Sequence, residues 1–412
     1  MDKYNSIAII GSAILCAAGQ NSKEFFNNSV KQQNPKNCKS IPEYLFKTEL
    51  NFPAFFLGPQ IIKQKEVLEF INPFLKENEL SNCPNRTVEL LLQCLYDLLI
   101  DAKIEPKKLQ QKTVGIVIGT TVGSTFNDEL YYRKYREGEI SSPYAVKNYL
   151  SSNLAQIVQS VLKTKGPTMV INNACASGTD ALGVASLWLK SGLCDVAIAG
   201  GVDELSKIAY IGFSNLQLTS KHPCKPFDIK RCGLNLGEGA GLTILTSYKK
   251  SIKSKGYILG YSCIADAYHP TAPHPKGEGL KKAIKYAIKQ ADIEVDSISM
   301  VNAHGTGTIA NDYSEAFAIE TTLGHKVPVV STKGITGHCL GAAGAIEAIW
   351  TIYALNNLIC PGTIGLTQKD PKININALIQ GENITLKGPI GISQSLAFGG
   401  SNSCIVLMGK EQ

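Results

Sequence analysis

The chain has 412 residues, of which 44% are hydrophobic and 18% charged, and its formal net charge at pH 7 is +7. These values are typical of one or two globular domains and exclude a disordered or fibrous protein. The positive excess is small and comes without an arginine-rich arm, zinc spacing or basic–aromatic motif. We therefore expect no nucleic-acid partner.

The first apolar stretch, IAIIGSAILCAAG (7–19), allows two interpretations. It imitates the core of a secretory signal peptide, but Gly11 and Ser12 interrupt it and the residues before it carry mixed charge. A buried first strand that ends in a turn explains it better. The following segment, 20–85, contains scattered Pro, Asn and Lys residues, and we interpret it as an excursion from the core.

The twelve cysteines are scattered singly, without a CxxC pair or a Cys/His cluster at the spacing of metal ligands. Thiols in this pattern favour a reducing compartment, so we expect a cytoplasmic protein. No apolar run approaches the roughly 20 residues that a membrane helix needs, so no membrane span is expected.

Eight apolar runs predict strands, and continuous apolar character predicts that helices cover both faces of the sheet. The runs are 113–119, 168–172, 195–202, 241–247, 298–305, 327–334, 391–400 and 403–409. Helical periodicity appears between them, at 179–192, 279–293 and 343–357. Alternating strands and helices predict a mixed, largely parallel α/β core.

Two stretches resemble each other and indicate a degenerate internal repeat. GIVIGTTVGSTFNDE (115–129) and VNAHGTGTIANDYSE (301–315) each contain a strand, a Gly/Thr loop, an Asn-Asp pair and the start of a helix. We place the junction in the Lys/Ser-rich YKKSIKSKGY (248–257). Two similar halves are therefore expected, 1–250 and 251–412.

The most informative stretch is INNACASGTDALGVASLWLKSG (171–192), which places Cys175 on a turn between a strand and a helix. The positive end of the helix dipole would stabilise a thiolate and lower the thiol pKa from its usual value of about 8.5. An arbitrary cysteine is usually a buried structural thiol. Here the neighbours are small enough to admit a substrate, and they are Ala174, Ala176, Ser177 and Gly178.

Two of the six histidines, His304 in NAHGTGT and His338 in TKGITGHCLGAAG, follow apolar strands in loops of small residues. Both should lie at the carboxyl edge of the sheet, where ligand sites of α/β proteins collect. Histidine carries protons near neutral pH. A single loop histidine is usually structural, but two in matching contexts indicate a catalytic pair. Polar neighbours of the pair are Thr306, Thr308, Lys333 and Glu347.

Five ordered motifs along nearly the whole chain resemble the β-ketoacyl-acyl carrier protein synthases of the elongating type, the KAS I/II group of the thiolase superfamily. They are NNACASG, KPFDIKRCGLNLGEGAG, NAHGTGT, STKGITGHCLGAAGAIE and AFGGSN. The resemblance implies a thiolase-like fold of two pseudo-repeated halves in a five-layered αβαβα arrangement, the first half with the nucleophile and the second with the histidines. It also implies a homodimer or a heterodimer with a related ketosynthase-like subunit.

The same resemblance implies a role for each matching residue. Cys175 matches the acylated nucleophile, and His304 and His338 match the pair that drives malonyl decarboxylation. Other matches are Lys333 and Glu347 as supporting residues, Thr306 and Thr308 as contacts of the carrier's pantetheine arm, Phe398 as gate and oxyanion residue, and Val122 at the end of the acyl pocket. The implied reaction is a decarboxylative Claisen condensation of an acyl-enzyme with malonyl carried on acyl carrier protein, and it needs no cofactor or metal.

Three departures from the family pattern leave the pathway open between fatty-acid and polyketide- or polyene-type biosynthesis. Cys232 stands where many relatives have Asp, and the next residues read GLNLGEG where many have GFVMGEG. The stretch before the gate reads SQSLAFGG where housekeeping enzymes often show SFGFGG, and Val122 stands where related enzymes often place a larger residue. Two other functions share the fold. A non-catalytic chain-length-factor partner would typically lack the cysteine, and a coenzyme A-dependent thiolase fits the two histidines less well.

Six basic residues are candidates for docking an acidic carrier protein, although any one of them fits a solvated surface about as well. They are Lys63, Lys65, Arg133, Lys134, Arg136 and Lys207.

Overall fold

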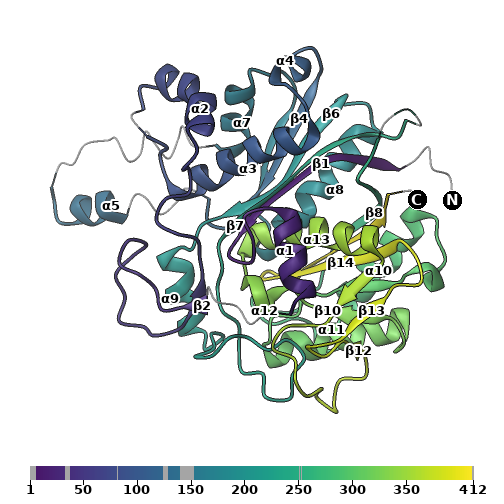
Figure 1. The fold of residues 1–412 in the computed structure, drawn as a ribbon. Helices are drawn as coiled ribbons and strands as arrows, with labels where there is room; N and C mark the ends of the chain where they lie inside the picture. Colours follow the sequence, from purple (N-terminus) through teal and green to yellow (C-terminus); the bar gives the residue numbers. More distant parts are fainter. Residues whose placement is uncertain are drawn as a thin grey trace.

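The structure is a computed structural model that describes residues 6–32, 38–80, 82–123, 129–139, 153–249, 251 and 253–410. Its centre is an 11-stranded sheet with the order β12-β10-β9-β14-β15-β8-β1-β7-β6-β4-β5. Figure 1 shows how helices cover this sheet on both faces. In the described part of the chain, no helix is long and apolar enough to span a membrane.

The strands fall into two matching sets. The first comprises β1 (Ile7–Cys16), β4 (Val114–Gly119), β5 (Thr168–Ile171), β6 (Val196–Asp203) and β7 (Gly239–Ser247). The second comprises β8 (Gly256–Ala265), β9 (Met300–Asn302), β10 (Pro328–Val330), β14 (Ile390–Ala397) and β15 (Ser401–Gly409), with β12 (Asn376–Ala377) at its edge. Two small sheets pair β2 (Cys38–Lys39) with β3 (Ala54–Phe55) and β11 (Ile359–Pro361) with β13 (Asn383–Thr385).

Both sets have the same internal pattern, which confirms the expected pseudo-repeat. β5-β4-β6 is parallel and continues antiparallel into β7 and β1. β10-β9-β14 is likewise parallel and continues antiparallel into β15 and β8. Three residue pairs between β1 and β8 join the two sets, Ile7–Ile9 against Gly256–Ile258. The domain boundary at residue 250 stays a prediction, and Lys250 itself lies outside the described residues.

The helices form three layers around the two sets of strands. α8 (Ser177–Lys190) and α13 (Ala343–Asn357) lie in the middle and contact each other. α3 (Arg86–Ala102) packs on β1 and β7, and α10 (Glu278–Ala291) packs on β8 and β15 beside α11 (Ile309–Leu323). The others are α1 (Ser22–Val30), α2 (Lys65–Glu77), α4 (Pro106–Leu109), α5 (Glu129–Arg136), α7 (Leu154–Leu162), α9 (Lys207–Asn215) and α12 (Lys333–Thr336).

Glycines let the two central helices approach closely at their N-terminal ends. A Cβ atom on Gly178 would lie 2.6 Å from the carbonyl oxygen of Gly341, and a Cβ on Gly344 would lie 2.1 Å from Oγ1 of Thr179. Both distances are too short for any side chain. The contact therefore brings the residues before α8 and the residues before α13 to one place.

The structure corrects three expectations from sequence. The core is mixed but not largely parallel, because continuous apolar runs report burial on both faces and not strand direction. The strand β8 was missed because polar residues interrupt its second half, YSCIA. The segment 20–85 is not only an excursion, since Phe25 and Phe26 of α1 are buried against Trp350 of α13. The predicted Asn-Asp pair at 127–128 lies outside the described residues.

Candidate active site

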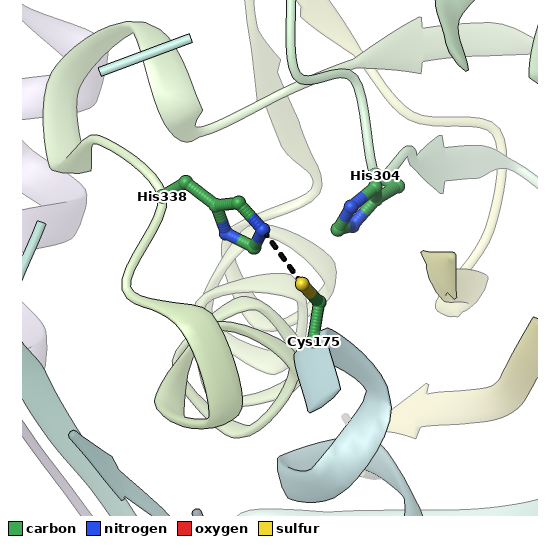
Figure 2. A group of neighbouring side chains, drawn as sticks. All are labelled: Cys175, His304 and His338. Carbon is green, nitrogen blue, oxygen red and sulfur yellow. Dashed lines mark hydrogen bonds between the residues drawn. The ribbon is translucent and has the colours of Figure 1, made fainter. Parts of the chain in front are cut away.

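Cys175 lies on the predicted turn between a strand and a helix. β5 ends at Ile171, a short 3-10 turn covers Ala174–Ala176, and α8 begins at Ser177. Ala174 has a left-handed backbone with φ of 44°, which makes the turn sharp. The Cys175 side chain is only 4% exposed, and its sulfur points toward the rings of His338 and His304 (Figure 2).

The structure brings both predicted histidines to this thiol (Figure 2). His338 Nε2 lies 3.0 Å from Cys175 Sγ, within hydrogen-bond distance. The His304 and His338 rings are edge to face, with centroids 5.1 Å apart. His304 lies 129 positions after Cys175 in the sequence, and His338 lies 34 positions after His304. Tertiary packing therefore brings the three side chains together.

Lys333 contacts His304 directly, and Glu347 contacts Lys333 in turn. The Lys333 ammonium, 1% exposed, lies 3.2 Å from His304 Nδ1 and 2.5 Å from a Glu347 carboxylate oxygen. Because an ammonium group only donates, Nδ1 of His304 accepts and its Nε2 carries the proton. Burial lowers the pKa of His304 well below its usual value, with the Lys333 charge adding to the effect, so the ring is neutral. His304 therefore presents an uncharged N–H donor at Nε2.

Burial also decides the protonation of the cysteine. It raises the pKa of the Cys175 thiol to about 12, although the Lys333 charge and the backbone N–H groups of Cys175 and Phe398 lower it. Burial lowers the pKa of His338 well below its usual value. The prediction of a thiolate stabilised by the helix start is therefore wrong for this state, because it counted the helix dipole and omitted desolvation. The resting pair is a neutral thiol beside a neutral imidazole.

Two buried carboxylates that the sequence analysis missed hold the loops of the site. Glu315 on α11 accepts the backbone N–H groups of His304 (2.6 Å) and Gly305 (2.8 Å). Asp203 at the end of β6 accepts those of Val122 (3.0 Å) and Gly341 (2.6 Å). The sequence does contain a signal for each residue. Asp203 directly follows the apolar run 195–202, and Glu315 lies eleven residues after His304.

The thiol opens to a cavity of about 190 Å³ that contains several of the predicted binding residues. Thr306 and Thr308 line it with their Oγ1 atoms 2.9 Å apart. The Phe398 ring stacks on Phe213 of α9 with centroids 5.2 Å apart, and Phe213 meets His338 edge-on at 6.4 Å. Phe213 was missed because nothing in its local sequence marks it.

Val122 is not among the residues that line this cavity but packs in an apolar cluster with Cys175. It is 4% exposed and belongs to an apolar cluster with Cys175, Leu205, Tyr210 and Leu340. The cluster also receives partly buried side chains from the early segment, namely Ile41, Leu45, Phe46, Phe52 and Phe56. Apolar surroundings of this kind around the thiol suit an acyl chain.

The ligand atoms of Cys175, His304 and His338 lie within 4.8 Å of one another, and this donor set would suit a zinc ion. The Lys333 ammonium beside His304 places a positive charge next to that position. Like charges repel strongly in a buried site, so the set is better suited to an anionic reacting group than to a cation.

Two matched α/β halves that enclose a cysteine and two histidines define a condensing enzyme of the thiolase-like fold. Residues 4–251 match the N-terminal domain of β-ketoacyl synthases, and residues 255–367 match the C-terminal domain of the same family. The chain belongs to the β-ketoacyl synthase family.

Curated relatives and solved structures agree with this assignment. The chain is 33% identical to 3-oxoacyl-[acyl-carrier-protein] synthase 2 of Synechocystis over 73% of this chain and 76% of the relative. It is 33% identical to the enzyme of that name from Staphylococcus aureus over 78% and 83%. A β-ketoacyl synthase from Burkholderia phymatum superimposes with a TM-score of 0.85 at 25% identity, covering 98% of this chain and 100% of the other. A chain from the complex of a Xenorhabdus doucetiae ketosynthase with its chain length factor gives 0.83 at 27% identity and 99% coverage of both chains.

The neutral histidines predict a loss of stability in acid. Their pKa values are lowered in the folded protein, so below about pH 6.5 the unfolded chain binds protons that the native state does not. The contribution of these two histidines to the free energy of unfolding should therefore fall as pH decreases from 7 to 5. In His338→Asn one of these protons is absent, and the slope should decrease by up to about 1.4 kcal/mol per pH unit. Urea unfolding at pH 5, 6 and 7 measures both slopes, and equal slopes would contradict the buried neutral histidine.

Proposed function

We propose that this protein is a 3-oxoacyl-[acyl-carrier-protein] synthase, in which Cys175 carries an acyl group and malonyl carrier protein extends it by two carbons. The observation that supports this best is the contact between Cys175 Sγ and His338 Nε2 with His304 beside it. The names of the curated relatives point to the same acyltransferase activity.

The first half-reaction transfers the acyl group to Cys175. The thiol proton moves to His338 as Sγ forms a bond with the thioester carbonyl carbon. The carbonyl oxygen becomes negative and is stabilised by the backbone N–H groups of Cys175 and Phe398, which also act on the thiol. The bond to the carrier's pantetheine sulfur then breaks, and His338 returns the proton to that sulfur.

The second half-reaction breaks the bond between the malonyl group and its carboxylate, and carbon dioxide leaves. The electron pair forms an enolate whose oxygen accepts a hydrogen bond from the His304 imidazole. His304 donates through Nε2, since Lys333 occupies its Nδ1. The enolate carbon attacks the acyl carbonyl, the bond to Cys175 breaks, and the thiolate takes up a proton from water. A neutral imidazole donor suits a developing enolate because it adds stabilisation without needing deprotonation.

Two other functions were considered for this fold. A non-catalytic partner of the chain-length-factor type needs no nucleophile, whereas Cys175, His304 and His338 are all present and in contact. A thiolase acting on coenzyme A fits the two-histidine arrangement less well, because that pair favours malonyl decarboxylation. Loading of the enzyme by different thioesters separates these functions from the proposed one.

Replacement of the nucleophile tests the proposal directly. Wild-type protein incubated with a panel of acyl carrier proteins should gain one acyl mass, located on Cys175 by peptide mass spectrometry. Cys175→Ala should gain none, while its circular dichroism spectrum remains that of the wild type. Cys232→Ser, a change at an exposed thiol, should still load. Condensation by Cys175→Ala, or loading on another thiol, would sink the assignment.

We propose that the basic helix α5 binds the acidic carrier. Arg133, Lys134 and Arg136 lie in its last turn, and Figure 1 places α5 on the opposite side of the molecule from α10. Lys207 begins α9, the helix that carries Phe213. Lys65 is paired with Glu69 on the surface, and Lys63 lines a separate groove, so neither supports this proposal.

Charge reversal tests the docking surface. Arg133→Glu with Lys134→Glu should raise the KM for acyl carrier protein about tenfold at low salt, because each reversal replaces an attraction by a repulsion. The effect should decrease at 0.5 M salt as screening increases. The matched control, Lys282→Glu with Lys285→Glu on the exposed face of α10, changes the net charge equally and should leave the KM unchanged. A salt-independent effect, or equal effects of the two variants, would reject the surface.

We propose further that the protein pairs through the edge strand β5, with a copy of itself or with a related subunit. In the described part of the chain β5 has a partner only on one side, β4. The carbonyl groups of Pro167 and Ile171 bond to β4, so the backbone groups of Val170 face outward. An unpaired edge of this kind is a template for strand pairing.

Val170→Pro removes the outward N–H group at a position where an edge strand tolerates proline. If β5 pairs between subunits, this variant should shift the mass measured by light scattering from dimer to monomer, while Val170→Thr stays dimeric. A dimeric Val170→Pro protein would exclude this interface. Dissociation of a heterodimer purified with a related subunit would show the same interface with a different partner.

A further inference from the structure

The turn before Cys175 has a backbone conformation that needs support. Ala174 has φ of 44°, a left-handed region that is unfavourable for a non-glycine residue. Locally, the N–H of Asn173 donates to Ser177 Oγ (2.8 Å), and this hydroxyl donates to the carbonyl of Ala174 (2.7 Å). These contacts close the turn upon itself but do not connect it to the second half of the molecule.

The connection is made by the side chain of Asn173. Its Nδ2 donates to Asp180 Oδ2 on α8 at 2.6 Å, and its Oδ1 accepts from Ser401 Oγ at 2.8 Å. Ser401 is the first residue of β15 and follows Phe398 by three positions. One amide therefore joins the turn that carries Cys175 to the loop that presents the Phe398 N–H group.

Asp180 decides the orientation of this amide. It is 4% exposed and also accepts from Tyr261 OH (2.9 Å) and Ser403 Oγ (2.5 Å). A carboxylate surrounded by donors accepts hydrogen bonds, so the NH2 group of Asn173 must face it. The amide oxygen is then directed at Ser401. The strands β8 and β15 thus set the direction of a side chain on the N-terminal turn.

The loop at Phe398 also has backbone anchors to residues 266–270. Gly399 N donates to the carbonyl of Pro270 at 2.7 Å, and Asp266 N donates to that of Gly400 at 2.7 Å. Gly399 and Gly400 both have positive φ values, 84° and 79°, and contribute no side-chain packing to the loop. Contacts on two sides, from residues 266–270 and from Asn173, hold it in place.

We propose that Asn173 is a positioning residue that, through Asp180 and Ser401, sets the alignment of the Phe398 N–H group with the Cys175 N–H group. The inference rests on the proposed acyl transfer to Cys175. Oxyanion donors act only when they are aligned to within about half an ångström, because their contribution comes from preorganisation. Asn173 touches neither the thiol nor the cavity, so its effect passes through the loop.

The test separates alignment of the donors from damage to the nucleophile. Acyl transfer forms a negative carbonyl oxygen, whereas alkylation of Cys175 by iodoacetamide displaces iodide and forms none. In Asn173→Ala the rate of acyl transfer should fall about tenfold or more, with the KM for the carrier unchanged. The alkylation rate should stay within about twofold of the wild type, since the thiol and His338 remain in place.

Two further variants give the controls. Ser401→Ala removes the same bridge from its other end, so the double variant Asn173→Ala, Ser401→Ala should be no slower than Asn173→Ala alone. Asn356→Ala removes a comparable bridge away from the site, where Nδ2 donates to the carbonyl of Lys255 (2.8 Å) and Oδ1 accepts from Lys410 N (2.6 Å). Both of its rates should match the wild type.

The outcomes are distinct. If Asn173→Ala loses acyl transfer and alkylation equally, the residue only supports the turn that carries Cys175. If Asn173→Ala transfers acyl groups at the wild-type rate, the residue aligns no oxyanion donor. Either result overturns the inference. Additive losses in the double variant overturn the bridge to Ser401. If wild-type protein does not acylate at Cys175 at all, the proposed function fails and the inference that rests on it fails too, whereas a wild type that acylates with an unaffected Asn173→Ala variant overturns the inference alone.

Discussion

The structure depends on the close crossing of α8 and α13. Gly178 and Gly344 leave no room for a side chain at this crossing, so the two helices begin almost in contact. Cys175 precedes one helix by two residues and His338 precedes the other by five. The thiol–imidazole contact of 3.0 Å follows directly from this packing. Each half of the pseudo-repeat contributes one helix, which explains why neither half contains a complete site.

Burial is the second constraint, and it sets the electrostatics of the site. The thiol and both imidazoles lose hydration, so desolvation favours their neutral forms. The Lys333 ammonium is compensated by Glu347, whose pKa burial raises against the attraction of that same ammonium. A buried pair of this kind contributes little to stability. Here the Lys333–Glu347 pair fixes the tautomer of His304, so its role is in the reaction and not in the stability of the fold.

Buried carboxylates of the core also hold the loops around the site in place. Glu315 and Asp203 are fully buried and accept backbone N–H groups of the loops that carry His304 and Val122. Asp180 does the same for a side chain, Asn173. The loops around the thiol contain many small residues, which pack weakly. Hydrogen bonds to carboxylates on regular elements replace that packing and hold the backbone in one geometry.

The sequence by itself determined the local features of this protein. Apolar runs located β4, β5, β6, β7, β9, β10, β14 and β15, and the small residues around Cys175 predicted its turn, because both are properties of neighbouring residues. Ordered motifs identified the family and the residues Cys175, His304 and His338. Only the tertiary structure decided the strand directions, the missed strand β8, the raised pKa of Cys175 and the contributions of Phe213, Glu315 and Asn173. Burial and contacts between residues far apart in the chain are sums over the whole fold, so no local pattern contains them.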